Sequence, residues 1–163
     1  MREGLLVDAY NLLYAARASA HARLFPDIKR LAFFLEHYAS HHGLLVVLAV
    51  DGTRFKDELG DTPVMRVIHS DGGVTADALM ESWMARLAPA EKLAWVLVSN
   101  DVSLCRMGSG MGLRVRSCAA VVADLAEFAR PEKRPGDPGR VGGPERGPNL
   151  GRPFNNPFGG LNG

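Results

Sequence analysis

The sequence predicts a three-layer α/β/α domain, in which helices cover both faces of a mostly parallel sheet of about five strands. Short aliphatic runs, typical of buried strands, alternate along the chain with segments whose apolar residues have helical spacing. In addition, three of the aliphatic runs are followed closely by an aspartate. The first observation predicts the fold, and the second predicts chemistry at one edge of the sheet.

Individual elements follow from these patterns in chain order. Buried strands are expected at 4–7 and 44–50, and Gly43 ends a helix over 26–42 between them. A weaker strand at 64–68 precedes a helix that Thr75 caps. That helix runs to about Leu87, and the remaining elements are a strand at 94–98, a short helix near 102–107, an edge strand at 113–116 and a closing helix at 119–129.

Composition divides the chain after Arg130. Residues 1–130 have room for one domain with a single core, in a chain of 163 residues that is 47% hydrophobic. Residues 131–163 are rich in Pro, Gly, Arg and Asn, and they hold too few large apolar residues to offset the entropy of ordering. We expect this tail to be disordered. A solubilising linker is the favoured role, and contact with single-stranded RNA is the alternative.

Charge and composition also limit partners and compartment. The net charge of +1 would not by itself attract nucleic acid or an anionic membrane, so any such contact must come from local charge. The N-terminal apolar stretch is too short for a signal sequence or a membrane span, which predicts a cytoplasmic protein with no membrane partner. Cys105 and Cys118 lack ligand spacing and are expected to be reduced, while His37 and His41 fit a solvated helix face. The oligomeric state stays open.

Acidic side chains are expected to converge at the carboxyl edge of the sheet. Asp8, Asp51 and Asp101 follow three of the aliphatic strands, and parallel strands end along the same edge, where ligands bind. Asp77 lies in the first turn of a helix, and Glu81 lies one turn later on the same helix face.

Such a cluster predicts a divalent cation. Unpaired carboxylates repel one another, and burial raises their pKa values, whereas a cation relieves both effects. No Cys or His is offered nearby, so the ligands are oxygens, which suit Mg²⁺ or Mn²⁺ rather than zinc. Because such a metal can activate a water for attack on a phosphodiester, the pattern indicates an acidic nuclease site.

Each acid also has an alternative structural role. Asp8 and Asp101 could cap the helices that follow them, and Asp51 could be an ordinary turn residue. Asp77 is favourable for the helix dipole in any case. For Glu81 the favoured interpretation is a solvated helix residue.

Neighbouring polar side chains are candidates for substrate contacts. Asn11 could orient the first aspartate or bind a phosphate oxygen, or it could simply begin a helix. Arg54 and Lys56 follow Asp51 closely in the sequence, at a position where the phosphate backbone of a nucleic acid would pass. Ser99 and Asn100 could hold a water, a metal or the substrate, although Ser-Asn is also common at strand ends.

Four motifs of the chain, taken in order, resemble the NYN-domain ribonucleases of the YacP type, a branch of the PIN-like superfamily. The resemblance covers nearly all of residues 1–130, and its motifs are LLVDAYNLL at 5–13, LAVDG at 48–52, VTADALMES at 74–82 and VLVSND at 96–101. One departure is Ala9, which stands where the YacP-type motif has glycine.

The resemblance implies a PIN-like Rossmannoid fold and a metal-dependent endoribonuclease. Its metal ligands would be Asp8, Asp77 and Asp101, with Asn11 and Asp51 beside them as further site residues. It also implies RNA as the substrate, with mRNA on a translating ribosome as the setting, so RNA and the ribosome are the expected partners.

Other functions remain to be weighed against this one. A catalytically inactive RNA- or ribosome-binding module is the alternative from a different class, and a flap-type 5′-nuclease acting on DNA is the enzymatic alternative. Small size and the missing helical arch argue against the DNA nuclease. A dehydrogenase is excluded because no G-x-G-x-x-G follows the first strand, and Tyr10 replaces the second acid of an aspartyl-phosphate phosphatase.

Overall fold

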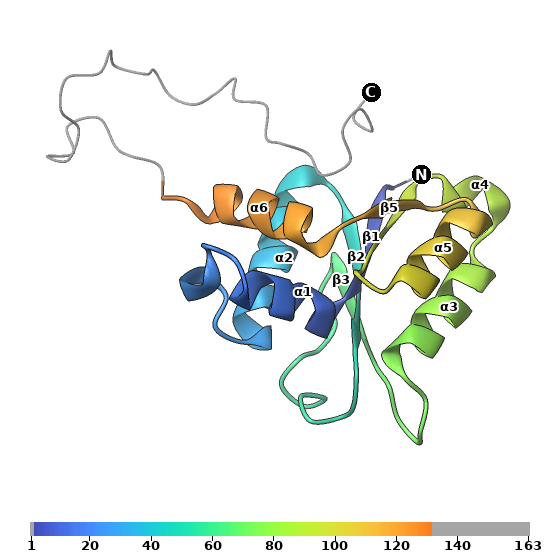
Figure 1. Cartoon of the computed structure of the whole chain (residues 1–163), viewed down its shortest axis with the longest axis horizontal. Coiled ribbons are helices and arrows are strands. Elements are labelled where there is room, and N and C mark those ends of the chain that lie inside the picture. Colours follow the sequence, from blue (N-terminus) through green and yellow to red (C-terminus); the bar gives the residue numbers. More distant parts are fainter. Residues whose placement is uncertain (1, 132–163) are drawn as a thin grey trace, which may run out of the picture.

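A computed structural model describes residues 2–131, so the tail expected to be disordered lies, apart from its first residue, outside the described residues. The elements, shown in Figure 1, are β1 (Gly4–Asp8), α1 (Ala9–Arg17), the 3₁₀ helix η1 (Ala22–Leu24), α2 (Ile28–His42), β2 (Leu45–Val50), β3 (Met65–His69), α3 (Ala76–Arg86), α4 (Pro89–Lys92), β4 (Trp95–Val98), α5 (Val102–Met111), β5 (Arg114–Arg116) and α6 (Cys118–Ala129).

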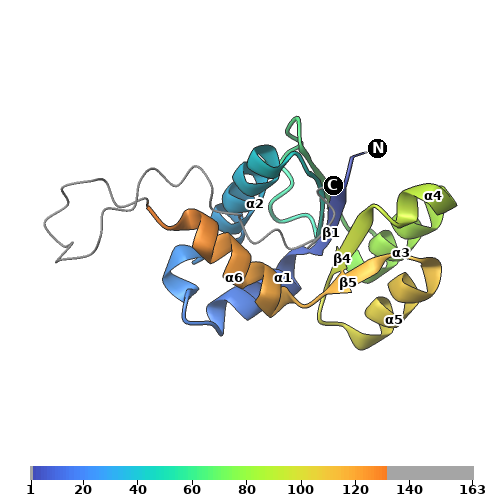
Figure 2. The same cartoon turned by 90° about the horizontal axis from the view of Figure 1, so that it is seen from above.

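The five strands form one parallel sheet in the order β3-β2-β1-β4-β5. Helices α1, α2 and α6 cover one face, and α3 and α5 cover the other, as the two views in Figures 1 and 2 show. The predicted three-layer α/β/α class is therefore confirmed. Strand order reverses at β1, because the chain proceeds from it to β2 on one side and later to β4 on the other.

Alternation along the strands builds two hydrophobic cores. In β1, Leu5 and Val7 pack with α1, α2 and α6, whereas Leu6 packs with α3 and α5. In β2, Leu48 belongs to the first of these cores and Val47 to the second. Successive side chains of a strand point to opposite faces, so a sheet covered on both faces needs the continuous aliphatic runs that the sequence contains.

Helix α5 is longer than the sequence predicted. The prediction ended it near Met107 because glycines follow, but the helix continues to Met111 and ends at Gly112, whose φ is 102°. A Cβ at Gly108 would lie 2.7 Å from the side chain of Leu97, so this glycine lets α5 pack closely on β4. The short helix α4, which begins at Pro89, is a second difference, because no helix was predicted between Leu87 and the strand at 94–98.

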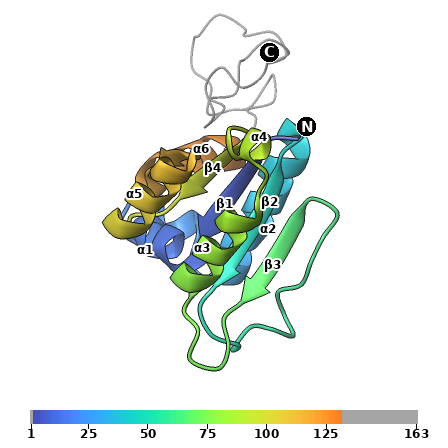
Figure 3. The same cartoon turned by 90° about the vertical axis from the view of Figure 1, so that its right-hand side faces the viewer.

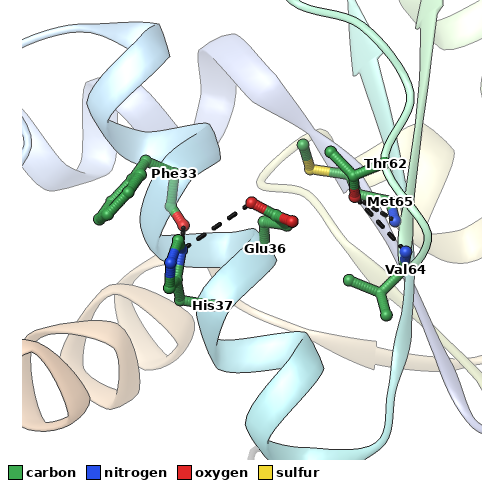
Figure 4. A network of polar contacts seen from close by, with 6 residues as sticks. All are labelled: Phe33, Glu36, His37, Thr62, Val64 and Met65. Carbon is green, nitrogen blue, oxygen red and sulfur yellow. Dashed lines mark hydrogen bonds and ion pairs between the residues drawn. The ribbon is translucent and has the colours of Figure 1, made fainter.

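The link between β2 and β3 contains no regular helix and returns along the outer side of β3 to the start of that strand, as Figure 3 shows. At its end, Thr62 Oγ1 accepts hydrogen bonds from the backbone N–H groups of Val64 (3.4 Å) and Met65 (3.1 Å), which turns the chain into β3 (Figure 4).

On α2, also in Figure 4, exposed His37 donates from Nδ1 to the carbonyl oxygen of Phe33 at 2.8 Å. This agrees with the solvated helix face predicted for His37.

The described residues also bear on two expectations drawn from composition. Within residues 2–131, no helix is long and apolar enough to cross a membrane. Cys105 and Cys118 are both free thiols, and the second is fully buried.

Candidate active site

A pocket of about 590 Å³ opens at the carboxyl ends of β1 and β2. The junction of β1 with α1, the end of β2 and the start of α3 form its walls. Its lining consists of three acids, one amide, three side chains with hydroxyl groups and one small apolar side chain: Asp8, Tyr10, Asn11, Tyr14, Asp51, Thr75, Ala76 and Asp77. The pocket therefore lies at the edge where the sequence placed the chemistry, beside the strand at which sheet order reverses.

Asp8 is the most deeply buried acid of this pocket, with 5% of its surface exposed. It ends β1 and caps α1, because its Oδ1 accepts a hydrogen bond from the backbone N–H of Asn11 at 3.1 Å. The capping role that the sequence offered as an alternative is thus present. Capping leaves Asp8 able to act in the pocket, because the cap uses one carboxylate oxygen and fixes the direction of the other.

Asp51 ties the end of β2 to the start of α3. Its Oδ1 accepts hydrogen bonds from the hydroxyl of buried Ser70 at 2.8 Å and from the backbone N–H of Ala76 at 3.2 Å. The Ser70 hydroxyl in turn accepts one from the N–H of Gly52 at 2.8 Å. Asp51 is therefore more than a turn residue, because tertiary hydrogen bonds hold it at the pocket wall.

Asp77 and Asp101 approach from the two helices on the other face of the sheet. Asp77 lies half-buried in the first turn of α3, behind the N-cap that Thr75 provides. Asp101 caps α5, with its Oδ1 accepting from the backbone N–H of Leu104 at 2.7 Å. Asp101 does not line the pocket, although its charge acts on Asp8 and Asp77.

Two acids of the site, Asp8 and Asp77, have raised pKa values. Burial raises the pKa of Asp8 above its ordinary value, and Asp77, Asp51 and Asp101 add to that rise; the N–H of Asn11 opposes it. For Asp77, burial again has the largest effect, and the charges of Asp101 and Asp51 raise its pKa further. Four carboxylates from four parts of the chain therefore act as one electrostatic cluster.

A chain of amide hydrogen bonds joins α1 to the loop after β4 and to the start of α6, and it forms one wall of the pocket. The side-chain Oδ1 of Asn11 accepts from the backbone N–H of Asn100 at 3.0 Å. The side-chain Oδ1 of Asn100 accepts from the backbone N–H of Cys118 at 3.1 Å. With both oxygens engaged, the two side-chain NH₂ groups remain as donors, one from each asparagine.

Other predicted residues stand apart from the pocket. Arg54 and Lys56 are exposed on the link after β2, where the Arg54 guanidinium lies 5.2 Å from the ring centre of Phe55. Neither lines the pocket. Glu81 is exposed on α3 and is also absent from the lining, in keeping with the solvated role favoured for it.

Sequence reasoning missed two tyrosines of the pocket. Tyr10 and Tyr14 lie one helical turn apart on α1, with ring centres 6.1 Å apart, and Tyr14 is 61% exposed. The i, i+4 spacing directly after Asp8 is visible in the sequence, and it places both rings on one side of the helix. An exposed aromatic ring beside a carboxylate cluster is a surface on which a nucleobase can stack.

The donor set of the cluster suits a hard divalent cation. Every candidate ligand is an oxygen, and each of Asp8, Asp51 and Asp101 has one carboxylate oxygen held by a hydrogen bond. Among residues 2–131, no three Asp, Glu, His or Cys side chains lie close enough to enclose a metal ion directly. Mg²⁺ commonly binds through one or two carboxylates and keeps several waters, so this wider spacing fits that ion.

Comparisons with known proteins identify the fold. Two crystal structures of Rae1 (YacP) from Bacillus subtilis are similar to this chain, one of a single-substitution mutant and one without it. The mutant has a TM-score of 0.58 and 20% identity, covering 77% of this chain and 76% of its own. The other has a TM-score of 0.54 and 20% identity, with 76% and 74% covered. No protein-family model and no curated protein matches the sequence. The chain thus shares the fold of Rae1 (YacP), as the motif resemblance implied.

Proposed function

We propose that this protein is a metal-dependent endoribonuclease that hydrolyses RNA phosphodiester bonds, with Mg²⁺ or Mn²⁺ held by Asp8, Asp77 and Asp101, in part through the water ligands of the metal. The single observation that carries the proposal is the acidic cluster at the sheet edge. Among the described residues, Asp8, Asp51, Asp77 and Asp101 form no ion pair with a basic side chain. The cluster therefore lacks a cation of its own, and a divalent metal would supply one.

A bound metal would polarise the phosphate and activate a water for its hydrolysis. The side chains around it have separate tasks. Asp8 would be the central ligand, because it is the most buried acid and its second oxygen has no hydrogen-bond partner among the described residues. Asp51 would fix the start of α3, and so hold Asp77 at the pocket, through its bond to the N–H of Ala76.

Asn11 would bind the substrate rather than the metal. Its Oδ1 is engaged by the N–H of Asn100, so its NH₂ group is the part available to the pocket that it lines. An amide NH₂ donates hydrogen bonds and suits a non-bridging phosphate oxygen. Asn100 offers the same group on the other side of the wall.

The resemblance to YacP-type ribonucleases and the fold shared with Rae1 (YacP) support the choice of substrate and setting. We propose RNA, and mRNA on a cytoplasmic ribosome in particular, as the substrate. Arg54 and Lys56 are exposed on the link after β2 and would contact the RNA or the ribosome outside the pocket.

The test is cleavage of an end-labelled, mixed-sequence single-stranded RNA by the full chain with Mn²⁺, Mg²⁺ or EDTA. Wild type is compared with Asp8→Asn and Asp101→Asn, and Glu81→Gln serves as the matched control because Glu81 is an exposed acid outside the pocket. We expect cleavage that needs metal, is lost in both aspartate variants and is kept in the control.

A thermal melt separates this proposal from an inactive binding module. Millimolar Mn²⁺ should raise the melting temperature of wild type, because a ligand that binds only the folded state stabilises it by mass action. If Mn²⁺ leaves the melting temperature unchanged and no RNA is cut on or off the ribosome, the inactive binding module is the better assignment.

A further inference from the structure

A second hollow, of about 920 Å³, lies beside the acidic pocket and differs from it in charge. It runs between α5 and the edge strand β5, and we call it the arginine groove. Three arginines contribute to its lining, and no acidic side chain does: Arg106 of α5, and Arg114 and Arg116 of β5. The acidic pocket has the opposite composition, with three aspartates and no Lys or Arg.

The two hollows share a wall. Asn11 lines the acidic pocket and Asn100 lines the arginine groove, and the hydrogen bond between them joins the two residues at 3.0 Å. Ser99, which precedes Asn100 at the end of β4, also lines the groove. A polymer held at the acids and crossing this wall would therefore pass directly into the arginine groove.

We propose that the arginine groove binds the part of a single-stranded RNA that extends from the cleavage site, with Arg106 as its main phosphate contact. This inference rests on the proposed function and adds where the RNA substrate runs on the protein surface beyond the cleavage site. The groove adjoins the acidic pocket across the Asn11–Asn100 hydrogen bond, and its positive charge complements a phosphate backbone.

Arg106 is the residue best placed to bind a phosphate. It is exposed on α5, and its side chain forms no hydrogen bond or ion pair with the other described residues. Arg116, in contrast, already lies 3.4 Å from the carboxylate of buried Asp124. Burial lowers the pKa of Arg114 while the charge of Glu3 raises it, so this side chain also has a nearby acid. Arg106 is thus the side chain whose charge is left for a ligand.

The apolar part of the groove favours a single strand over a duplex. Val102 is 64% exposed at the start of α5, and Val115 is 37% exposed on β5. Both line the groove. Apolar side chains next to guanidinium groups suit unpaired bases beside their phosphates, whereas a duplex keeps its bases stacked inside.

The experiment measures binding of a fluorescent, mixed-sequence single-stranded RNA to the full chain in EDTA, where metal-dependent cleavage is silent, across a series of salt concentrations. Arg106→Ala is compared with Arg106→Lys, which keeps the charge, and with Arg66→Ala. Arg66 is a matched control because it is an exposed arginine on β3, at the opposite edge of the sheet.

We expect Arg106→Ala to weaken binding about 5- to 10-fold and to reduce the slope of log affinity against log salt by about 0.7, the value for one phosphate contact on a single strand. Arg106→Lys should keep most of the affinity, and Arg66→Ala should resemble wild type. RNA carrying 4-thiouridine should cross-link to the segment 99–116.

The outcomes separate this inference from the proposed function. Equal affinity and salt slope for Arg106→Ala and wild type, or cross-links only outside 99–116, overturn the groove while leaving a cleaving enzyme intact. A wild type that binds as expected but cuts no RNA supports the groove and counts against the nuclease. A wild type that neither binds nor cuts overturns both.

Discussion

The two hollows at the carboxyl edge of the sheet differ in charge, in burial and in how firmly their side chains are held. In the acidic pocket, Asp8 is buried and Asp51 is fixed by hydrogen bonds to Ser70 and Ala76. In the arginine groove, Arg106 is exposed and has no such bonds among the described residues.

This difference suggests a division of labour between the hollows. Side chains that perform chemistry must be held in place before the substrate arrives, because catalysis depends on preorganised charge. Side chains that grip a flexible, charged polymer can remain mobile, since much of their contribution is electrostatic and tolerates varied geometry. The acidic pocket should therefore control the rate of the chemical step, and the groove should control affinity.

Kinetics of two variants would test this division. Asp77→Asn removes a charge from the acidic cluster, and we expect kcat to fall about 100-fold or more with little change in KM. Arg106→Ala should instead raise KM about 5- to 10-fold and leave kcat close to that of wild type. Initial rates of RNA cleavage in Mn²⁺ over a range of RNA concentrations measure both parameters.

Circular dichroism and melting curves of both variants provide the control for folding. Arg106 is exposed, and the Asp77 carboxylate accepts no hydrogen bond from the other described residues, so neither change should unfold the domain. A loss of kcat in Arg106→Ala as large as that in Asp77→Asn would contradict the division between the hollows.

Tyr14 sharpens the comparison because it places an affinity contact on the acidic side. The ring is 61% exposed and lines the acidic pocket. Stacking of one base on an aromatic side chain is worth about 1–3 kcal/mol, and for this exposed ring we expect Tyr14→Ala to raise KM about 5-fold. Tyr14→Phe keeps the ring and should behave as wild type. Equal KM values for Tyr14→Ala and wild type in the same cleavage assay would exclude stacking.

The parallel fold and the meeting of acids were predictable from the sequence for a simple reason. Parallel strands end at one edge, so aspartates that follow Val7, Val50 and Val98 must come near one another whatever the details of packing. Asp77 followed from its place in the first turn after Thr75. These inferences needed only the order of elements and their polarity, which local sequence patterns carry well.

The arginine groove was not predictable, because it depends on packing between elements far apart in the chain. Glycines near the end of α5 suggested an early stop, but Gly108 fits against Leu97 and the helix continues. The longer helix brings Ser109 to the groove, opposite Arg114 and Arg116 on β5. No local pattern states how closely a helix packs on its sheet, so the three arginines look like unrelated surface charges in the sequence.

Asp8 offers a further way to test the acidic pocket, through stability rather than catalysis. Its pKa is raised in the folded protein by burial and by the neighbouring acids, so the folded state favours the protonated form. The stability linked to this group is present at low pH and is lost as pH rises through the folded-state pKa. Without metal at neutral pH, the charge on Asp8 should therefore destabilise the domain.

Asp8→Asn in EDTA should raise the melting temperature by a few degrees, at about 4 °C for each kcal/mol, because asparagine removes the charge and still caps α1. The gain should grow from acidic to neutral pH. Asp8→Ala is the matched variant, since it removes both charge and cap and should gain less or lose stability. In Mn²⁺, wild type should have a higher melting temperature than either variant, because the ion should stabilise wild type alone. A lower melting temperature for Asp8→Asn than for wild type in EDTA would mean that repulsion among the carboxylates does not destabilise the metal-free domain. The cluster would then have no need for a cation.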